Sequence, residues 1–220
     1  MKIFLNDKIF EFSQNELDNM YIDEGKEGIV YRYGDYVLKI YHPCSRKERL
    51  SEDMVRKLTK IHTDKFLLPL GLIFNNTKKF CGYYSKRVVS NSLDYISNMP
   101  LNFLYNEIKE FERDIDLLTN NHVEINDFLG INILYDGSFY MCDPGSFLFD
   151  ESYSFDELKK INIEKLNRFF IDEVIGKDCS TRKLNNIYNF FGDLSIPLNN
   201  QLTFVERPNE TIRQFVKRIS

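Results

Sequence analysis

The spacing of apolar residues changes once along this chain, from the alternation typical of strands to the three- and four-residue spacing typical of helices. Strand-like segments dominate the first 89 of the 220 residues, and a long amphipathic helix is predicted at 101–120. The apolar face of that helix carries Leu104, Ile108, Phe111, Ile115 and Leu118. This order predicts an α+β fold with two lobes, in which an antiparallel β-sheet lobe with one main helix precedes a mostly helical lobe.

The β-rich part is predicted to be a mostly antiparallel sheet, because short polar or glycine-containing turns separate its strand-like segments. One helix interrupts it after Pro43, with Ser45 as N-cap and Glu48 as capping-box partner, and runs to about His62. A hairpin is predicted over residues 1–13, and further strands over 20–24, 28–33, 36–41, 66–74 and 80–89.

The second part is predicted to be helical apart from one small hairpin around Asp136-Gly137. We place the division into two lobes between residues 88 and 89, so that residues 1–88 and 89–220 form one two-lobed unit. The hairpin strands are predicted at 131–134 and 138–142, a short helical turn at 92–97, and further helices near 155–175, 180–191 and 208–219.

Composition excludes several classes of function. The chain is 43% hydrophobic with a net charge of −4, so it lacks the basic excess of a nucleic-acid-binding protein. No apolar run approaches the roughly 20 residues of a membrane span, and the first apolar segment stops at Asn6-Asp7, too early for a signal peptide. The four cysteines form no close pair, which is typical of reduced thiols. We therefore expect a cytoplasmic protein without nucleic-acid or membrane partners.

Two local patterns in the β-rich part suit phosphate binding. Gly25 and Gly28 lie in a turn between two predicted strands, where glycines let backbone N–H groups approach phosphate oxygens. A plain hairpin turn explains the same glycines. Lys39 lies in mid-strand between apolar neighbours, so its ammonium group requires phosphate oxygens or a helix carboxylate. The alternative for Lys39 is an edge-strand position that points to solvent.

Two patterns in the helical part suit a base and a metal ion. Asp127 precedes a short loop, and Asn132 follows five residues later at the start of a predicted strand. Asp143 follows eleven residues after Asn132, across the predicted hairpin. Asn132 and Asp143 would then flank one site and offer the hard oxygen ligands that Mg²⁺ prefers. A simple Asp-Pro-Gly turn at Asp143 is the alternative.

The four patterns together, in this order, resemble the protein-kinase superfamily over about residues 19–150. Asp23 stands in place of the first glycine of the glycine-rich loop, and Pro144 in place of the Phe of the Asp-Phe-Gly element. The segments that resemble the glycine-rich loop, third strand, hinge, catalytic loop and Asp-Phe-Gly element are 22–31, 37–40, 85–93, 125–134 and 142–145.

The resemblance implies an ATP- and Mg²⁺-dependent phosphotransferase. Lys39 would hold the α- and β-phosphates, Asp127 would orient or deprotonate the acceptor hydroxyl, and Asn132 and Asp143 would bind Mg²⁺. The family also needs a helix carboxylate to pair with Lys39, for which Glu52 is the first candidate and Glu48 the second. Phosphate cover and adenine contacts would come from Gly25, Gly28, Ile22, Val30, Leu134 and the backbone of Lys86, Arg87 and Val88.

The sequence departs from the family pattern around the catalytic Asp. Ile125 and Asn126 replace the usual His-Arg, Leu129 replaces a lysine, and no Ala-Pro-Glu motif follows Gly145. The first interpretation is a Ser/Thr protein kinase. The alternatives are a small-molecule kinase of the aminoglycoside or choline type, a pseudokinase that binds nucleotide as a regulatory module, and a kinase-like protein that transfers AMP.

Overall fold

The chain divides into two compact units in the computed structural model. The first unit comprises residues 1–63, 67–89 and 143–146, and the second comprises 64–66, 90–142 and 147–220. The residues described are 2–5, 8–43, 49–91, 96–202, 207 and 209–219. The main break, after residue 89, lies next to the predicted one, but the short segments 64–66 and 143–146 are exchanged between the units, which no local sequence signal indicated.

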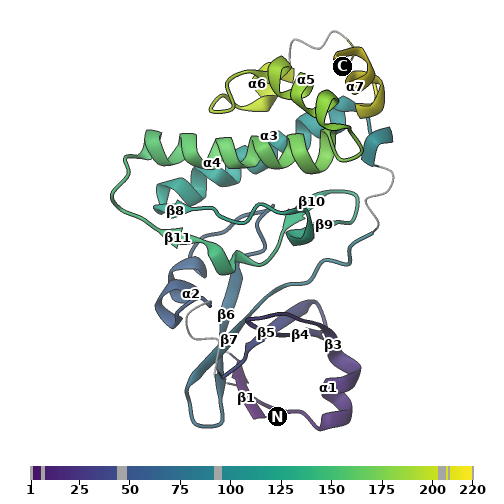
Figure 1. Ribbon diagram of the computed structural model, residues 1–220. Helices are drawn as coiled ribbons and strands as arrows, with labels where there is room; N and C mark the ends of the chain where they lie inside the picture. Colours follow the sequence, from purple (N-terminus) through teal and green to yellow (C-terminus); the bar gives the residue numbers. More distant parts are fainter. Residues whose placement is uncertain are drawn as a thin grey trace. The chain divides into compact units, whose positions relative to one another are not determined.

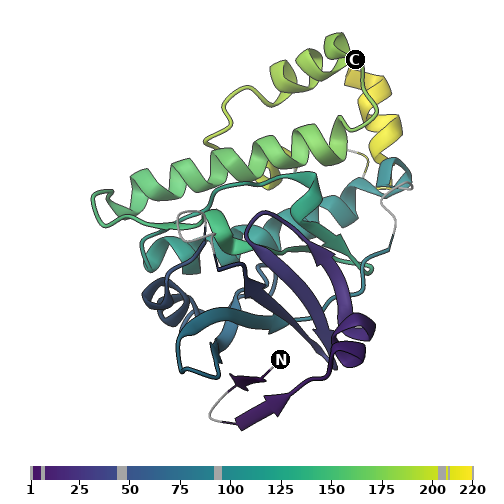
Figure 2. The ribbon, with the colours of Figure 1, turned by 60° about the horizontal axis from the view of Figure 1, so that its bottom comes forward.

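A strongly curled antiparallel sheet of seven strands forms the first unit (Figures 1 and 2). Its spatial order is β2-β1-β6-β7-β5-β4-β3, which places β5 between β7 and β4. The strands are β1 (Lys2–Leu5), β2 (Lys8–Glu11), β3 (Tyr21–Glu24), β4 (Gly28–Tyr33), β5 (Tyr36–Tyr41), β6 (Pro69–Asn75) and β7 (Phe80–Lys86). The predicted hairpin and the predicted strands of this part are confirmed, apart from their ends.

Alternating side chains of the strands form the core of this sheet, because successive residues of a strand point to opposite faces. Leu38 and Ile73 are fully buried in it, together with aromatic and aliphatic partners. The buried members of this core are Ile3, Leu17, Tyr31, Leu38, Ile73 and Tyr84.

Two helices accompany the sheet. Helix α1 (Gln14–Met20) was not predicted, although Ser13 and Glu16 form a reciprocal capping box that the sequence displays. Helix α2 (Glu52–Leu58) is shorter than the predicted helix from Ser45 to about His62, since Ser51 is its N-cap and accepts a hydrogen bond from Met54 N. The predicted cap residues Ser45 and Glu48 lie outside the described residues.

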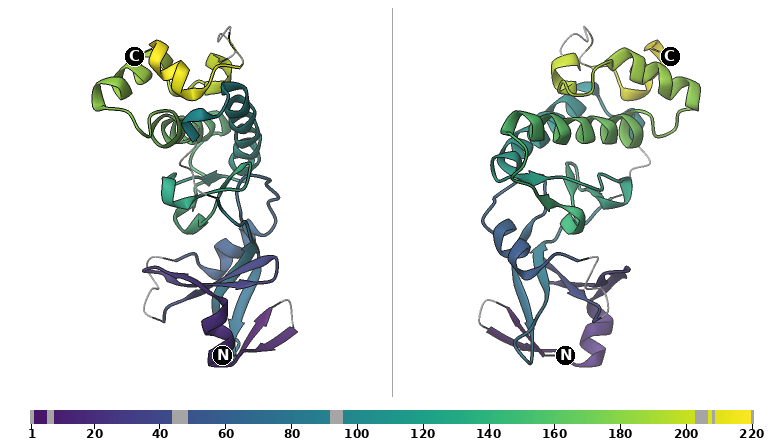
Figure 3. Two further views of the ribbon diagram at one scale, coloured as in Figure 1. Left: turned by 90° about the vertical axis from the view of Figure 1, so that its right-hand side faces the viewer. Right: turned by 60° about the vertical axis from the view of Figure 1, so that its left-hand side comes forward.

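Two long helices, α3 (Leu101–Asn120) and α4 (Phe155–Phe169), pack side by side in the second unit (Figures 1 and 3). The predicted bounds of α3 are confirmed, and all five predicted apolar positions of its buried face are inaccessible to solvent. Helix α4 continues into a π-helical segment, η4 (Phe170–Ile175), so the predicted helix at 155–175 changes its pitch near the end.

Short elements complete the second unit. The predicted hairpin is confirmed as β9 (Ile133–Tyr135) and β10 (Phe139–Met141), whereas the two-residue strands β8 (Val123–Glu124) and β11 (Leu148–Phe149) were not predicted. The remaining helices are α5 (Thr181–Phe191), α6 (Leu198–Leu202) and α7 (Ile212–Ile219), of which α6 was not predicted. The 3-10 turns of this unit are η1 (Ile96–Asn98) and η2 (Gly130–Asn132). A third 3-10 turn, η3 (Pro144–Ser146), belongs to the first unit. No helix in the described part of the chain has the length and apolar character needed to cross a membrane.

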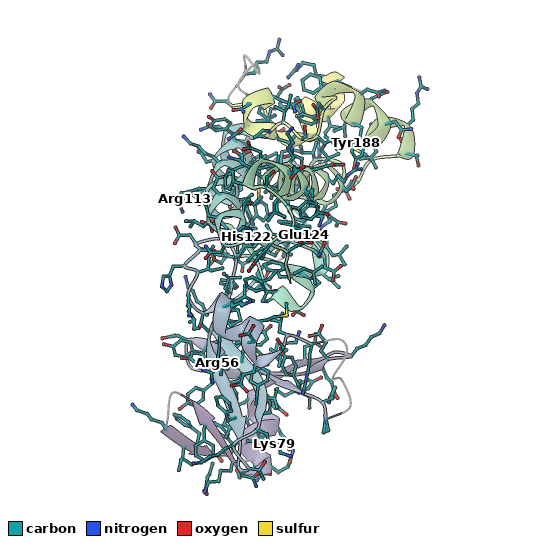
Figure 4. All side chains as sticks on the ribbon, turned by 90° about the vertical axis from the view of Figure 1, so that its left-hand side faces the viewer. Arg56, Lys79, Arg113, His122, Glu124 and Tyr188 are labelled. Carbon is teal, nitrogen blue, oxygen red and sulfur yellow. The ribbon has the colours of Figure 1, made fainter. Side chains whose placement is uncertain are left out.

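Segment 64–66 is held in the second unit by a buried charge network. The Lys65 ammonium lies 2.9 Å from Glu107 and 2.8 Å from Glu110, and only 2% of this side chain is exposed. Burial would lower the pKa of Lys65, but hydrogen bonds and charges from Glu110 and Glu107 outweigh it and raise the pKa. Asp114 accepts hydrogen bonds from the backbone N–H groups of Asp64 and Lys65 at 2.7 and 2.6 Å, and Arg113 of α3, labelled in Figure 4, also contacts Asp64.

Candidate functional site

Lys39 lies on an interior strand of the curled sheet and not at its edge. Its strand, β5, is paired on both sides, and the Cα partners of Lys39 are Val30 on β4 and Tyr83 on β7. Only 10% of the Lys39 side chain is exposed. The edge-strand alternative for Lys39 is therefore wrong, and its ammonium group needs partners within the protein or from a ligand.

Two carboxylates meet the Lys39 ammonium group. Lys39 Nζ lies 2.5 Å from Asp143 Oδ1 and 2.7 Å from Glu27 Oε2. The Tyr83 hydroxyl donates a longer hydrogen bond, 3.5 Å, to the same oxygen of Asp143. We call Lys39, Glu27, Asp143 and Tyr83 the Lys39 cluster. It joins the predicted phosphate-binding lysine to the predicted metal-binding aspartate, 104 residues apart in the sequence.

The Lys39 cluster contains one basic and two acidic side chains, and this excess of negative charge affects the pKa of the neighbouring Tyr41 hydroxyl. Tyr41, on the same strand as Lys39, is buried. Burial raises the pKa of its hydroxyl, and the charges of Glu27 and Asp143 raise it further. A site of this kind favours an additional cation beside the Asp143 carboxylate, 40% of whose side chain is exposed.

The prediction that Glu52 pairs with Lys39 is wrong. Glu52 Oε1 lies 2.7 Å from Arg56 Nη2 one turn later on α2, and 42% of the Glu52 side chain is exposed. Because α2 begins only at Glu52, this residue is in the first turn of an exposed helix face, where an ion pair four residues along is the nearest partner. The second candidate, Glu48, lies outside the described residues.

Glu27 was missed by the sequence reasoning, although it stands between the two glycines of the predicted phosphate loop. The turn that carries it is closed by hydrogen bonds from Gly25 N to Gly28 O (3.0 Å) and from His42 N to Glu27 O (2.8 Å). The sequence does contain a signal for this contact. Glu27 is an acidic residue between two glycines of a turn, close in sequence to the strand that carries Lys39.

Gly28 and Gly145, in the predicted glycine-rich loop and Asp-Phe-Gly element, both lie close to neighbouring groups. A Cβ at Gly28 would collide with the backbone carbonyl of Ile40, so the pairing of β4 with β5 requires glycine there. A Cβ at Gly145 would lie 2.8 Å from Glu27 Oε1 and 3.2 Å from Asp143 Oδ1, so this glycine makes room for the Lys39 cluster. Gly25 has open space around it, and no steric reason for glycine exists at that position.

Asp127 and Asp143 both have left-handed backbone conformations, with φ of 54° and 57°. Such conformations are uncommon for residues other than glycine and cluster at functional sites. Lys78 and His122 are the other two positive-φ residues in the described chain. Half of these strained positions therefore coincide with the predicted base and the predicted metal ligand.

The loop with Asp127 belongs to the second unit and is tightly organised. Asn132 Nδ2 donates to the Asp127 carbonyl oxygen at 3.1 Å, and Leu129 N donates to the same oxygen at 2.8 Å. The amide nitrogen of Asn132 is thus used inside the loop. Cys142 N donates to Asn132 O at 2.8 Å, which fixes the end of β10 against the loop.

The residues that depart from the family pattern have structural partners. Ile125 is fully buried, and its N–H donates to Asn162 Oδ1 at 2.9 Å. Asn126 accepts a hydrogen bond from Lys165 Nζ at 2.6 Å, and Lys165 also lies 2.5 Å from Glu124. The side chain of Leu129 is exposed, and Ile131 is exposed to 85%. The loop therefore presents apolar side chains to solvent on either side of Gly130.

The predicted nucleotide contacts are divided between the units. Ile22, Val30, Lys86 and Val88 belong to the first unit, and Leu134, on β9, belongs to the second. Ile22 and Lys86 are exposed, and Val30 and Val88 are half-buried. The N–H of Arg87, between Lys86 and Val88, donates to Asp35 O at 2.8 Å, so it is already engaged by the β4–β5 turn. The structure places each of these residues only within its own unit.

A metal site formed by protein side chains alone is absent from the described residues, which contain no group of three or more His, Cys, Asp or Glu side chains suited to one. Mg²⁺ at nucleotide sites commonly takes one or two carboxylates and completes its coordination with phosphate oxygens and water. The exposed carboxylate of Asp143 fits that pattern within the first unit, whereas Asn132 belongs to the second unit. Comparison of the chain with protein-family models and with curated proteins finds no match.

Proposed function

We propose that this protein has a two-lobed, kinase-like fold and transfers the γ-phosphate of ATP to a hydroxyl group. The observation that carries the proposal is the 2.5 Å contact of the Lys39 ammonium with Asp143. The family pattern assigns these two residues to the phosphates and to Mg²⁺. They are far apart in the sequence, and the fold brings the largely buried Lys39 side chain to the partly exposed carboxylate of Asp143.

Lys39 would bind the α- and β-phosphates, and Asp143 with Asn132 would hold Mg²⁺. Asp143 directly follows Cys142, whose N–H binds the Asn132 carbonyl, so the chain itself limits how far the two ligands can separate. Mg²⁺, when bound, would neutralise negative charge that develops on the phosphates. The two carboxylates of the Lys39 cluster already make this site suited to a cation.

Asp127 would accept the proton of the acceptor hydroxyl. The hydroxyl oxygen forms a bond to the γ-phosphorus, the bond from that phosphorus to the β–γ bridging oxygen breaks, and ADP leaves. Hydrogen bonds from Asn132 and Leu129 hold the backbone of Asp127, and its side chain is exposed and accessible to an acceptor. Leu129 replaces the lysine that commonly steadies the transferred phosphate, so we expect slow turnover.

The acceptor is proposed to be a Ser or Thr side chain of a protein. Leu129 and Ile131, exposed on both sides of Gly130, would contact apolar side chains of a polypeptide acceptor bound at this loop. A small polar hydroxyl compound of the aminoglycoside or choline type would gain little from them.

A pseudokinase is the second candidate, and the Glu27 contact favours it. Lys39 is already neutralised by Glu27 and Asp143, so nucleotide phosphates would have to replace at least one carboxylate. A protein that holds nucleotide weakly and does not turn it over would tolerate this arrangement.

The test is incubation of the protein with γ-labelled ATP and Mg²⁺, alone and with cell lysate, followed by mass spectrometry. We expect label on serine or threonine, and we expect Asp127→Asn to lower the rate by about 10²-fold or more while ATP affinity stays unchanged. Asp136→Asn, in the exposed β9–β10 turn, is the matched control. Label on small molecules only would support a small-molecule kinase, and ATP binding without any labelled product would support the pseudokinase.

A further inference from the structure

We infer that the second unit contains a separate binding site for a phosphorylated peptide segment, at a pocket between η4, α5 and α7. These elements pack against one another and lie together at the end of the unit that carries the C-terminus (Figure 1). The pocket has a volume of about 310 Å³ and includes none of the residues assigned to phosphate transfer. Its main lining residues are Val174, Ile175, Lys177, Lys183, Arg213 and Lys217.

The rim of the pocket is strongly cationic. Lys177, Lys183, Arg213 and Lys217 line it with a single acidic residue, Asp178, although the whole chain has a net charge of −4. All four cations are exposed, and within the described part of the chain no carboxylate lies at ion-pair distance from them. Arg213 is oriented by its hydrogen bond to Ser97 Oγ at 3.2 Å. Four cations against one carboxylate around the same pocket favour an anionic ligand.

The floor of the pocket is aliphatic. Val174 and Ile175 come from η4, and Ile212 and Val216 come from α7, and all four are buried. Helix α7 is amphipathic, since its apolar residues pack inward while Arg213 and Lys217 face solvent. The floor therefore suits an apolar side chain next to the anionic group of the ligand.

Segment η4 adds an independent indication. Its six residues are π-helical, a rare conformation that occurs often at functional sites. Gly176 then ends it in a sharp turn, where a Cβ would lie 2.7 Å from the Ile171 carbonyl oxygen. This turn directs the following residues, Lys177 and Asp178, to the rim of the pocket.

A phosphorylated residue beside an aliphatic one matches these features best. A phosphomonoester carries between one and two negative charges at neutral pH and three strong acceptor oxygens, which suits several cations better than one carboxylate does. No aromatic side chain is among the residues that line the pocket in the described chain, so a nucleobase would lack a stacking partner. The volume is at the lower end of ligand sites and fits one or two side chains.

The test measures fluorescence anisotropy of a labelled peptide, Gly-Ile-phosphoserine-Ile-Gly, with the intact protein. We expect binding at least about tenfold tighter than that of the same peptide with serine or aspartate, and a loss of affinity at about 0.3 M NaCl. Inorganic phosphate should compete with at least about tenfold lower affinity, because it does not reach the aliphatic floor. Equal affinity for phosphoserine and aspartate peptides, or equal affinity for inorganic phosphate, would overturn the inference.

A charge-reversed double variant, Lys183→Glu with Arg213→Glu, locates the site. We expect it to bind the phosphopeptide at least about tenfold more weakly than the parent. The matched control is Lys109→Glu with Lys160→Glu, which makes the same charge change at exposed positions of α3 and α4. Thermal melting of all proteins checks that they fold. Equal loss in the control and the pocket variant would show unspecific attraction and overturn the site.

Discussion

At the scale of single residues, one ammonium group faces two carboxylates within 2.7 Å. An unpaired ammonium group in the protein interior costs free energy. The position of Lys39 between apolar neighbours in a strand therefore already predicts that it has partners. Asp143 was among the residues assigned to the same site, but Glu27 was not. The resemblance predicts a carboxylate from the following helix as the partner of Lys39, whereas Glu27, in the turn between β3 and β4, makes this contact.

Glu27→Gln should raise the affinity for ATP by about three- to tenfold, because it removes a negative charge that competes with phosphate for Lys39. Calorimetric titration with ATP and Mg²⁺ measures this change. Glu24→Gln is the matched control, since Glu24 lies in the neighbouring strand β3 and contacts His42 instead. Unchanged or weaker binding in the Glu27 variant would show that Glu27 supports the nucleotide site and does not compete with it.

At the scale of elements, strong periodicity and local capping made most helices and strands predictable. The bounds of α3 follow from its apolar positions, and β5 matches its predicted range. Helix α2 begins later than predicted, because Ser51 is its N-cap. The strands β8 and β11 have two residues each and depend on a pairing across more than twenty residues, which no local pattern records.

Asn162 joins α4 to the loop that carries Asp127, and its removal should destabilise the protein. The side chain is fully buried, accepts from Ile125 N and donates to Thr119 Oγ1 and Val123 O. Asn162→Ala leaves these groups without partners, so we expect the free energy of unfolding to fall by about 2–4 kcal/mol. Urea unfolding measures this loss, and Asn189→Ala at an exposed position of α5 should change it little. Similar stability of both variants would contradict the anchoring role.

The contact of α3 with α6 should make stability depend on pH. The pKa of Glu112 is raised to about 7, mainly by burial and further by the negative charge of Asp116. The hydrogen bond from Asn199 on α6 and the charge of Lys159 on α4 act in the opposite direction and lower this pKa. A carboxyl group with a raised pKa in the folded state stabilises that state when protonated. This contribution is complete below the ordinary pKa of 4.5 and is lost as pH rises through about 7.

Glu112→Gln keeps the hydrogen bond from Asn199 without the charge. We expect it to equal the parent in stability near pH 5 and to exceed it by roughly 1–2 kcal/mol near pH 8, after allowance for partial exposure of the carboxylate. Thermal or urea unfolding at both pH values measures the difference. Glu151→Gln, in the exposed turn before α4, is the control, and a difference that does not depend on pH would contradict the assignment.

At the scale of the whole molecule, the order of a β-rich part and a helical part was predictable, and the exchange of short segments between the units was not. Segment 64–66 joins the second unit through Lys65 and Asp114, and segment 143–146 joins the first through the contact of Asp143 with Lys39. In each case a buried lysine meets a carboxylate that lies 42 or 104 residues away in the sequence. Such pairings leave no periodic trace in a single sequence.

Magnesium-dependent binding of ATP to the Lys39 cluster is the central claim, and equilibrium binding of labelled ATP to the intact protein tests it most directly. We expect binding with Mg²⁺ that weakens by at least about tenfold without it and is similarly weakened by Asp143→Asn, while Asp136→Asn binds like the parent. The account would be contradicted if the parent bound no ATP, or if Asp143→Asn bound it as tightly as the parent in the presence of Mg²⁺.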